Sequence, residues 1–373
     1  MQRLLLTFYD LTGSFDHLDL VNSWFICVAC VVTFSSLLPR LQSKHYRHQS
    51  TKEKDYNSAR TLLKEKMRST DTYALFLRLA WSDAATYDKS ISEWPRCGGA
   101  NGRIRFNHEL DFVENRGLIV AITLLENVKD ECPLVSWADL IQMSGALAVE
   151  LLGGPKVHIK YGRVDAEDEE EFKYQLAKNL PRSTPPYADG APSAGIHIRC
   201  IFYRMGLTNR DIVALSGAHT IGRAFRNRSG VCLNSSGDQG ATSYTRKSKC
   251  TLYSDNPSAT MAGGKSWTKN WLHFDNSYFT CRVQSFLENN GEFCNNFRGK
   301  DNGHNDDKND LIWLPSDQAL IDCPEFRIYF LKYAKSLQEF FHDYAVAHKK
   351  MSELGCKFLP AAGFFVIDSN ENE

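Results

Sequence analysis

Apolar residues recur at helical spacing through most of this chain, and this periodicity restricts the fold more than any other feature of the sequence. From about Asp55 onward, apolar side chains three and four positions apart share a face, while the alternation typical of strands is rare. Several helix starts carry a hydroxyl residue with an acidic residue three positions later. These pairs are Ser136 with Asp139 and Thr208 with Asp211. Glycines follow the same two helices, at 153–154 and 217. We therefore predict one mainly α-helical domain.

The composition indicates a globular chain without excess charge. Its 373 residues are 43% hydrophobic, and 44 basic side chains balance 44 acidic ones. We expect no nucleic-acid partner, because proteins that bind nucleic acids usually carry a basic stripe. The 11 cysteines lack the spacing of a secreted disulfide framework, which favours reduced thiols in a cytosolic compartment.

Two polar stretches interrupt the helical pattern. Residues 231–266 are rich in Ser, Thr, Gly and Lys, and we interpret them as a flexible surface insertion. Residues 289–310 form a second stretch dominated by Asn and Asp. Both are predicted to be loops that decorate the helical domain.

A segment without charged residues lies near the N-terminus. Residues 20–38, LVNSWFICVACVVTFSSLL, nearly suffice to cross a bilayer core of roughly 30 Å. Acidic residues precede the segment and basic residues follow it, so the positive-inside rule places the bulk of the chain in the cytosol. We predict a tail over 1–19, a single-pass anchor over 20–38 and a linker over 39–54, in the endoplasmic reticulum or, alternatively, a mitochondrial membrane. A cleaved signal peptide is the other reading, but its preceding stretch would be shorter and basic.

A cation, a large aromatic ring and a hydroxyl share one face of the helix predicted around residues 75–88. Arg78, Trp81 and Ser82 stand at positions i, i+3 and i+4 of LFLRLAWSDAATYD. Together they could line a cofactor pocket. A serine is unexpected at position 82, where such a pocket would need a base.

Three further motifs carry candidate site residues. His219 lies in DIVALSGAHTIGRAFRNRSG, Trp267 in SWTKNWLHFDNSYF and Asp317 in WLPSDQALIDCPEFRIYFLKYA. Singly, each residue is more often a core or capping residue than a functional one. Together with LRLAWS, ENRGL and GGPKV they follow, in order, the motifs of the class I haem peroxidases, the ascorbate and cytochrome c peroxidase group. The chain resembles this family from about residue 60 to 358.

The resemblance implies a haem-dependent peroxidase fold over 55–362, with haem b between distal and proximal helical halves and a short tail over 363–373. It implies His219 as the proximal iron ligand, Asp317 as its hydrogen-bonding partner and Trp267 as the proximal tryptophan. The implied distal residues are Arg78, Trp81 and Asn115. A carboxylate that accepts the histidine Nδ1–H gives the imidazole more imidazolate character and stabilises oxidised iron.

The resemblance also implies a proximal cation site for K⁺ or Ca²⁺, since hard oxygen ligands suit these ions. Ordinary capping and turn formation is an equally good reading of the same residues. The four positions are Thr220, Thr268, Asn270 and Asp275.

The chain departs from the family at its distal base. Active members read LRLAWH, whereas this chain has Ser82 in place of the histidine that moves a proton within hydrogen peroxide. Positioned acid–base help is worth roughly 10² to 10⁴ in rate, and serine has no pKa near neutrality. Asp83 lies about 100° round the helix and is expected to point elsewhere. We therefore predict weak activity with hydrogen peroxide.

Positions used for ascorbate in the family are altered as well. Thr70 and Thr72 replace a lysine and a cysteine, and Phe225 stands where a propionate-contacting histidine is common. Arg228 matches the arginine that contacts ascorbate. One retained contact is weak support, so ascorbate is not the expected donor.

A cysteine follows the distal helix in a glycine-rich loop. We hypothesise that Cys97 of EWPRCGGANGR is a sixth ligand to the iron, with Arg96 favouring the thiolate. An ordinary loop thiol is the alternative. A peroxidase fold with an anchor, no distal histidine and a candidate thiolate resembles the kinetoplastid pseudoperoxidases, a branch associated with peroxynitrite removal.

Three functions remain open on this evidence. The first is a haem enzyme that isomerises or reduces peroxynitrite, an oxidant that is largely anionic near neutral pH and has a weak O–O bond. The second is a tethered haem sensor in which O₂, CO or NO displaces Cys97. The third is a conventional peroxidase that draws electrons from cytochrome c docked on residues 289–310. Ser82 argues against the third function.

Overall fold

The computed structural model describes residues 51–167, 180–182, 185–187, 189–225, 245, 264–288 and 311–366. The chain divides into two compact units, residues 1–54 and 55–373, and the second unit contains the fold below. The predicted membrane anchor, the loop over 289–310 and Arg228 lie outside the described residues. Within the described part of the chain, no helix is both long and apolar enough to cross a membrane.

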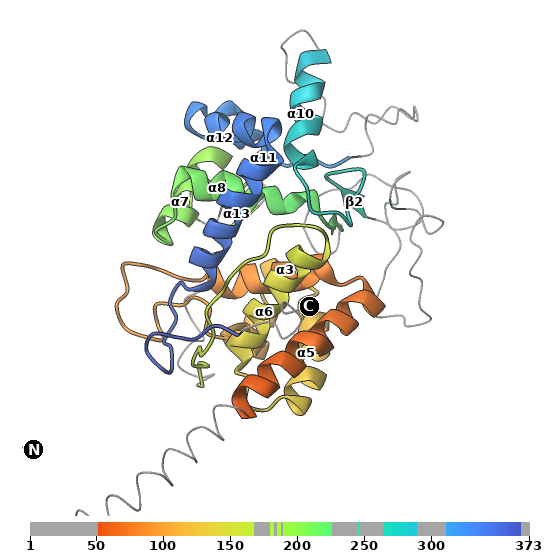
Figure 1. Cartoon of the computed structure of the whole chain (residues 1–373). Helices are drawn as coiled ribbons and strands as arrows, with labels where there is room; N and C mark the ends of the chain where they lie inside the picture. Colours follow the sequence, from red (N-terminus) through yellow and green to blue (C-terminus); the bar gives the residue numbers. More distant parts are fainter. Residues whose placement is uncertain are drawn as a thin grey trace, which may run out of the picture. The chain divides into compact units, whose positions relative to one another are not determined.

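The described elements are almost all helical, as predicted (Figure 1). Residues 55–70 are helical. The α-helices that follow are α3 (Tyr73–Ala84), α4 (Asn107–Leu110), α5 (Ile119–Glu131), α6 (Trp137–Leu151), α7 (Ala194–Arg204), α8 (Asn209–Ser216), α10 (Ser277–Glu288), α11 (Pro315–Asp322), α12 (Pro324–Lys335) and α13 (Leu337–Ser352). The 3₁₀ turns are η1 (Arg103–Arg105), η2 (Val113–Asn115) and η5 (Gly217–Thr220). Two short strands, β1 (Arg223–Ala224) and β2 (Lys265–Ser266), pair antiparallel.

The β2 strand corrects one sequence-based expectation. Residues 231–266 were expected to be a flexible insertion throughout, but the backbone of Ser266 pairs with Arg223. The buried Thr245 hydroxyl also donates to the Gly264 carbonyl, 2.8 Å away. The far end of this segment is therefore fixed to the domain by backbone pairing that no local sequence pattern indicates.

The predicted helix starts are confirmed. Ser136 Oγ accepts the Asp139 N–H at 3.1 Å at the start of α6. Thr208 and Asp211 form a reciprocal capping box at the start of α8, because each side chain accepts the other's backbone N–H. These caps satisfy backbone donors that have no partner inside the first helical turn.

The two glycine signals act differently. Gly153, after α6, adopts a left-handed conformation with φ +88°, as a helix-ending glycine should. Gly217 instead has φ −60° and continues from α8 into the 3₁₀ turn η5. A Cβ there would lie 2.4 Å from a ring carbon of Phe340. Position 217 therefore requires glycine because of packing, not because of backbone conformation.

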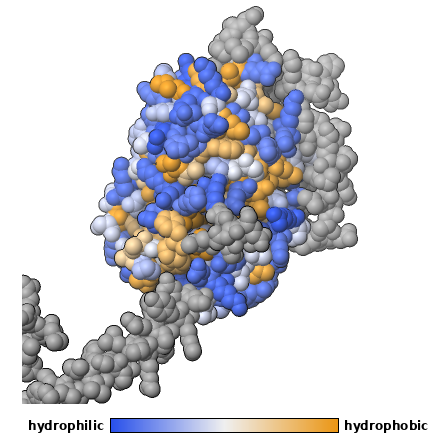
Figure 2. Space-filling view, viewed as in Figure 1, coloured by the Kyte–Doolittle hydropathy of each residue, from blue (hydrophilic) through white to orange (hydrophobic). Residues whose placement is uncertain are grey.

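Two groups of helices make up the second unit (Figure 1). In one group α3 packs along α6, with α5 beside them; the other contains α7, α8, α10, α11 and α12. Helix α13 contacts both α3 and α8 and so joins the groups. Helix α6 is buried on every side from Ala138 to Val149, which places it in the core. Figure 2 shows polar residues over much of the visible face of this unit, with scattered apolar ones between them.

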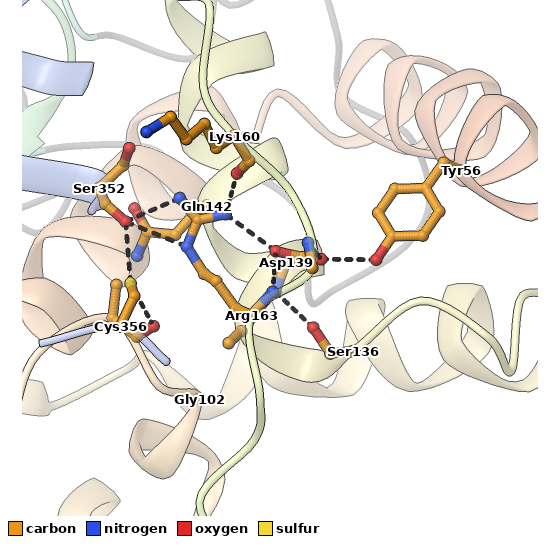
Figure 3. Close-up of polar contacts among 12 residues, drawn as sticks. Tyr56, Gly102, Ser136, Asp139, Gln142, Lys160, Arg163, Ser352 and Cys356 are labelled. Atoms are coloured by element: carbon orange, nitrogen blue, oxygen red, sulfur yellow. Dashed lines mark hydrogen bonds and ion pairs between the residues drawn. The ribbon is translucent and has the colours of Figure 1, made fainter. Parts of the chain in front are cut away.

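A buried ion pair links distant segments of the core (Figure 3). Arg163 Nη1 lies 2.8 Å from Asp139 Oδ1, and both side chains are fully buried. Arg163 also donates to the Ser352 carbonyl at the end of α13, while the Tyr56 hydroxyl donates to Asp139. A buried charge is tolerated only with such a complete set of partners. This cluster therefore fixes α6 and α13 beside the helical segment 55–70.

Candidate active site

Three predicted site residues converge on the carboxylate of Asp317. His219 Nδ1 lies 2.8 Å from Asp317 Oδ1, and Trp267 Nε1 donates to Asp317 Oδ2 at 2.7 Å. The rings of His219 and Trp267 are stacked, with centroids 4.4 Å apart and planes 16° apart. The residues come from η5, from the turn after β2 and from α11, so only the tertiary fold unites them.

Asp317 also has a structural role at the start of α11. Pro315 starts α11, and Asp317 accepts the Leu314 N–H at 2.8 Å as a helix cap does. The carboxylate therefore caps its own helix and accepts bonds from the site at the same time. The sequence left capping and a role in the site as alternatives for Asp317. The geometry allows one carboxylate to do both.

Tyr278 is a member of this cluster that the sequence reasoning missed. Its hydroxyl donates to Asp317 Oδ1 at 2.7 Å, and its ring meets the His219 ring edge-on. Burial raises the pKa of Tyr278 far above its usual range, and the neighbouring Asp317 charge adds to this effect, so the phenol remains a donor. Its place near the end of SWTKNWLHFDNSYF, the motif that contains Trp267, was the available signal.

The cluster keeps Asp317 ionised. Burial alone would raise the pKa of the carboxyl, but the facing His219 imidazole and the donated hydrogen bonds hold that pKa below its usual range. His219 must then present its Nδ1 as N–H toward an anion. With Nδ1 engaged, and 37% of its side chain exposed, His219 keeps Nε2 for another partner.

Three of the distal candidates lie on α3, in the other group of helices. The guanidinium of Arg78 donates to the Glu114 and Arg116 carbonyls at 2.6 and 3.0 Å. Trp81 packs against Phe202 of α7, with ring centroids 5.2 Å apart. Ser82 is buried, with 3% of its surface exposed. The predicted arginine, tryptophan and serine are therefore ordered on one helix.

Asn115 contains a buried acceptor without a partner. Its Nδ2 donates to the Glu109 carbonyl at 2.8 Å, yet its Oδ1 accepts no hydrogen bond within the part of the chain that the structure describes. Leaving a buried polar atom unpaired costs about 1–3 kcal/mol, so such atoms are rare in native structures. In the family resemblance, this asparagine accompanies a distal histidine that the chain lacks.

Asp83 points away from Ser82, as expected from the helical angle. Its carboxylate accepts the Gly102 N–H at 3.0 Å and the Ile104 N–H at 3.4 Å. Burial raises the pKa of Asp83 to about 7, although these N–H groups and the charge of Arg103 act in the opposite direction. Asp83 therefore anchors the loop after α3 and does not replace the missing base.

Cys97 is a buried thiol beside the end of α3. Its carbonyl accepts the Asp88 N–H at 2.7 Å, and its Sγ lies 3.5 Å from the Gly98 carbonyl oxygen. Arg96 pairs with Glu93 at 3.2 Å on the surface, and burial raises the pKa of the Cys97 thiol. The contact of Arg96 with Glu93 is with a surface carboxylate, and burial of Cys97 acts against the thiolate that was expected.

Three of the four candidate cation ligands lie together near His219. The Thr220 hydroxyl donates to Asp275 Oδ1 at 3.0 Å, and the Thr268 hydroxyl donates to the Thr220 carbonyl at 2.7 Å. For Asn270, the backbone carbonyl accepts the His273 N–H. No group of three or more His, Cys, Asp or Glu side chains suited to a metal occurs in the described ranges. Any cation here would depend on the single carboxylate of Asp275 together with hydroxyl and carbonyl oxygens.

Two of the positions aligned with ascorbate contacts, 70 and 72, carry a hydroxyl group where the family has a lysine and a cysteine. Thr70 and Thr72 are buried, and their hydroxyl oxygens lie 2.7 Å apart in a mutual hydrogen bond. Phe225 is buried under the Arg223 guanidinium, which lies 5.1 Å from the ring centroid. These side chains are occupied by local contacts.

Comparison with known proteins decides the family. The model of the peroxidase family matches residues 56–336, which span all the motifs above. The chain belongs to this family. Its relatives place it among the class I haem peroxidases, and haem is the cofactor.

The relatives are plant ascorbate peroxidases. The chain is 42% identical over 311 residues to a rice protein (Oryza sativa subsp. japonica), the probable L-ascorbate peroxidase 8, chloroplastic, and covers 56% of it. It is 41% identical to L-ascorbate peroxidase T, chloroplastic, of Arabidopsis thaliana, covering 62% of that protein. It is 40% identical to the rice probable L-ascorbate peroxidase 7, chloroplastic, covering 74%. Each match uses 83% of this chain, which spans little more than half of the first relative.

The residues present fit a haem peroxidase. An imidazole whose Nδ1 is hydrogen-bonded to a carboxylate, and whose Nε2 has no partner among the described residues, is a suitable ligand for haem iron. The stacked Trp267 completes an electron-rich proximal side. His219, Asp317 and Trp267 thus have the mutual geometry that the resemblance implies.

Proposed function

We propose that this chain is a haem pseudoperoxidase that reacts weakly with hydrogen peroxide and removes peroxynitrite. Two observations carry the proposal: His219 and Trp267 share the Asp317 carboxylate, and α3 has a buried Ser82 at the position where the resemblance implies a base. The buried Oδ1 of Asn115, which accepts no hydrogen bond among the described residues, supports it, because a distal imidazole could donate to this acceptor. Asp83 is turned toward Gly102 and offers no substitute base.

Peroxynitrite suits a site without a base. The anion needs no deprotonation before it binds ferric iron, whereas hydrogen peroxide must lose a proton. Isomerisation to nitrate breaks the O–O bond, forms an N–O bond and needs no reductant. Reduction to nitrite would consume two electrons and two protons and release water; an external one-electron reductant would supply both electrons in turn, with Trp267 as the candidate relay. Haem, when bound, supplies the iron that receives the oxidant.

Each residue of the site would have a separate role. His219 would hold the iron through Nε2, and Asp317 would keep Nδ1–H oriented. Arg78 would attract and orient the anion, since its guanidinium remains charged at any physiological pH. Trp81 would form part of the distal wall. None of these roles requires a titrating group at position 82.

We further propose that Cys97 is a sixth ligand. The thiol lies in a loop that is held to the segment following α3: the Asp88 N–H donates to the Cys97 carbonyl, and the Gly99 N–H donates to the Thr86 hydroxyl. Burial opposes the free thiolate, so coordination itself would have to stabilise it, as metal ions do for thiols. A low-spin ferric spectrum that becomes high-spin in Cys97→Ala supports this ligand, and a high-spin spectrum of the unmodified chain rejects it.

The decisive experiment compares two oxidants in stopped-flow mixing. The haem-loaded chain should accelerate peroxynitrite decay strongly and react sluggishly with hydrogen peroxide. Equal, fast reaction with hydrogen peroxide would contradict the proposal and restore a conventional peroxidase. No turnover of either oxidant would favour the gas sensor, which uses the same iron site.

We propose that residues 20–38 anchor the chain in a membrane with the haem domain on the cytosolic side. The support is the uncharged segment with its acidic and basic flanks. Fractionation of cells that express the full chain, beside a chain that starts at residue 45, tests this. Carbonate-resistant membrane association of the full chain alone supports the anchor, and equal solubility of both rejects it.

A further inference from the structure

A short turn of the backbone supplies hydrogen-bond acceptors to the Arg78 guanidinium. Its two carbonyl acceptors, on Glu114 and Arg116, flank Asn115 in and beside η2. The position of the guanidinium therefore depends on where this turn lies. Anything that fixes the turn also fixes the distal positive charge.

The turn is held on its inner and its outer side. Inside, Asn115 Nδ2 donates to the Glu109 carbonyl at 2.8 Å. Outside, the Glu114 carboxylate accepts Arg182 Nε at 3.1 Å, with 13% of the glutamate and 42% of the arginine side chain exposed. The outer contact comes from a segment 68 residues further along the chain.

Arg182 is itself anchored to a buried histidine. Its backbone N–H donates to His197 Nε2 at 2.9 Å, and His197 Nδ1 lies 2.8 Å from Asp189 Oδ1. The His197 ring is 1% exposed and stacks on Tyr187, with centroids 4.5 Å apart. Both ring nitrogens are engaged, so His197 is fixed in one orientation on the first turn of α7.

We propose that Arg182 and Glu114 are positioning residues for Arg78. A continuous chain of contacts runs from His197 to the Arg182 backbone, through the Arg182–Glu114 ion pair, and through the Glu114 carbonyl to the Arg78 guanidinium. The pair holds the distal cation in place for an incoming anion. The inference rests on the proposed distal role of Arg78 and extends it to two residues that touch neither haem nor substrate.

The direction in which two substitutions change anion affinity separates a positioning role from a direct charge effect. Removing the Arg182 charge should weaken anion binding under either explanation. Removing the Glu114 charge should strengthen anion binding if only the local field matters, since a negative charge is lost. If the pair positions Arg78, Glu114→Gln should instead weaken anion binding, because the turn that carries the acceptor carbonyl loses its outer support.

The experiment titrates fluoride onto the ferric haem of the full chain and follows the absorption spectrum. All variants carry Cys97→Ala, so that a thiolate does not compete with fluoride. We expect Arg182→Gln and Glu114→Gln each to raise the fluoride Kd about threefold or more. Lys160→Gln is the matched control, because it removes one charge from a half-exposed ion pair with Glu353 elsewhere on the domain. Its Kd should stay unchanged.

A double-mutant cycle completes the test. In an Arg78→Ala background, Arg182→Gln and Glu114→Gln should no longer change the Kd, since coupling through Arg78 is gone. Tighter binding in either variant, an unchanged Kd in both, or equal losses with and without Arg78 would overturn the inference. If Arg78→Ala alone leaves the Kd unaltered, the proposed distal role of Arg78 fails instead.

Discussion

Replacing Ser82 with histidine should restore part of the missing acid–base function. The side chain at position 82 is buried on α3, one helical turn after Arg78. An imidazole there could donate its N–H to Asn115 Oδ1, the buried acceptor that lacks a partner among the described residues. The other ring nitrogen would then be available to take a proton from hydrogen peroxide.

The expected gain in rate follows from the rate enhancement that a positioned base provides. Such groups contribute roughly 10² to 10⁴ in rate, or about 3 to 5 kcal/mol at 1.36 kcal/mol per tenfold. An imidazole added to a site that evolved without one will not reach the full value. We expect the second-order rate constant with hydrogen peroxide to rise by about 10-fold to 100-fold. The rate with peroxynitrite should change much less, because that step needs no base.

The assay is stopped-flow reaction of the ferric protein with hydrogen peroxide at several concentrations. Ser82→Phe is the matched control, since it adds an aromatic ring of similar size without a titrating nitrogen. Ser82→His combined with Asn115→Ala should lose most of the gain, because the imidazole loses its orienting acceptor. Equal rates for Ser82→His and Ser82→Phe would refute the reasoning and make ligation or access limiting.

Four further substitutions test other parts of the structure. Asp83→Asn and His348→Phe should alter the pH dependence of stability in opposite directions between pH 4 and 7. The Asp83 pKa is raised to about 7, so the parent loses stability there as the pH rises, by up to about 4 kcal/mol. Burial, with a smaller effect of Arg163, lowers the His348 pKa to about 4, so the parent loses stability as the pH falls from about 6.5, by up to about 3 kcal/mol. Urea unfolding across this range measures both, and parallel curves for parent and variants would contradict them. Asp317→Ala should lower the free energy of unfolding by about 3 kcal/mol or more, because four donors lose their shared acceptor carboxylate. It should also move the reduction potential of the iron to more positive values. Thermal unfolding and spectroelectrochemistry measure the two effects, and an unchanged potential would contradict the prediction. Gly217→Ala should destabilise the fold by about 1–3 kcal/mol through the clash with Phe340, and stabilisation in a thermal melt would show that the ring can move aside.

Short-range features could be predicted from the sequence because they depend on neighbouring residues. The capping box of Thr208 and Asp211, the Ser136 cap and the shared face of Arg78 and Ser82 follow from spacing along one helix. The separated motifs were sufficient to predict that the chain belongs to the peroxidase family. The substitution of the distal base is likewise visible in the sequence alone.

Long-range contacts were decided only by the tertiary structure. His219 and Asp317 are 98 positions apart, and the role of Tyr278 as a further donor depends on where α10 lies relative to α11. Spacing also could not show that Arg96 turns to Glu93, or that Arg182 reaches Glu114 across 68 positions. Local sequence specifies which helices form and which faces are apolar. The packing of those faces then determines which polar atoms meet, and this sets the pKa of Asp83, the open acceptor of Asn115 and the support of the distal arginine.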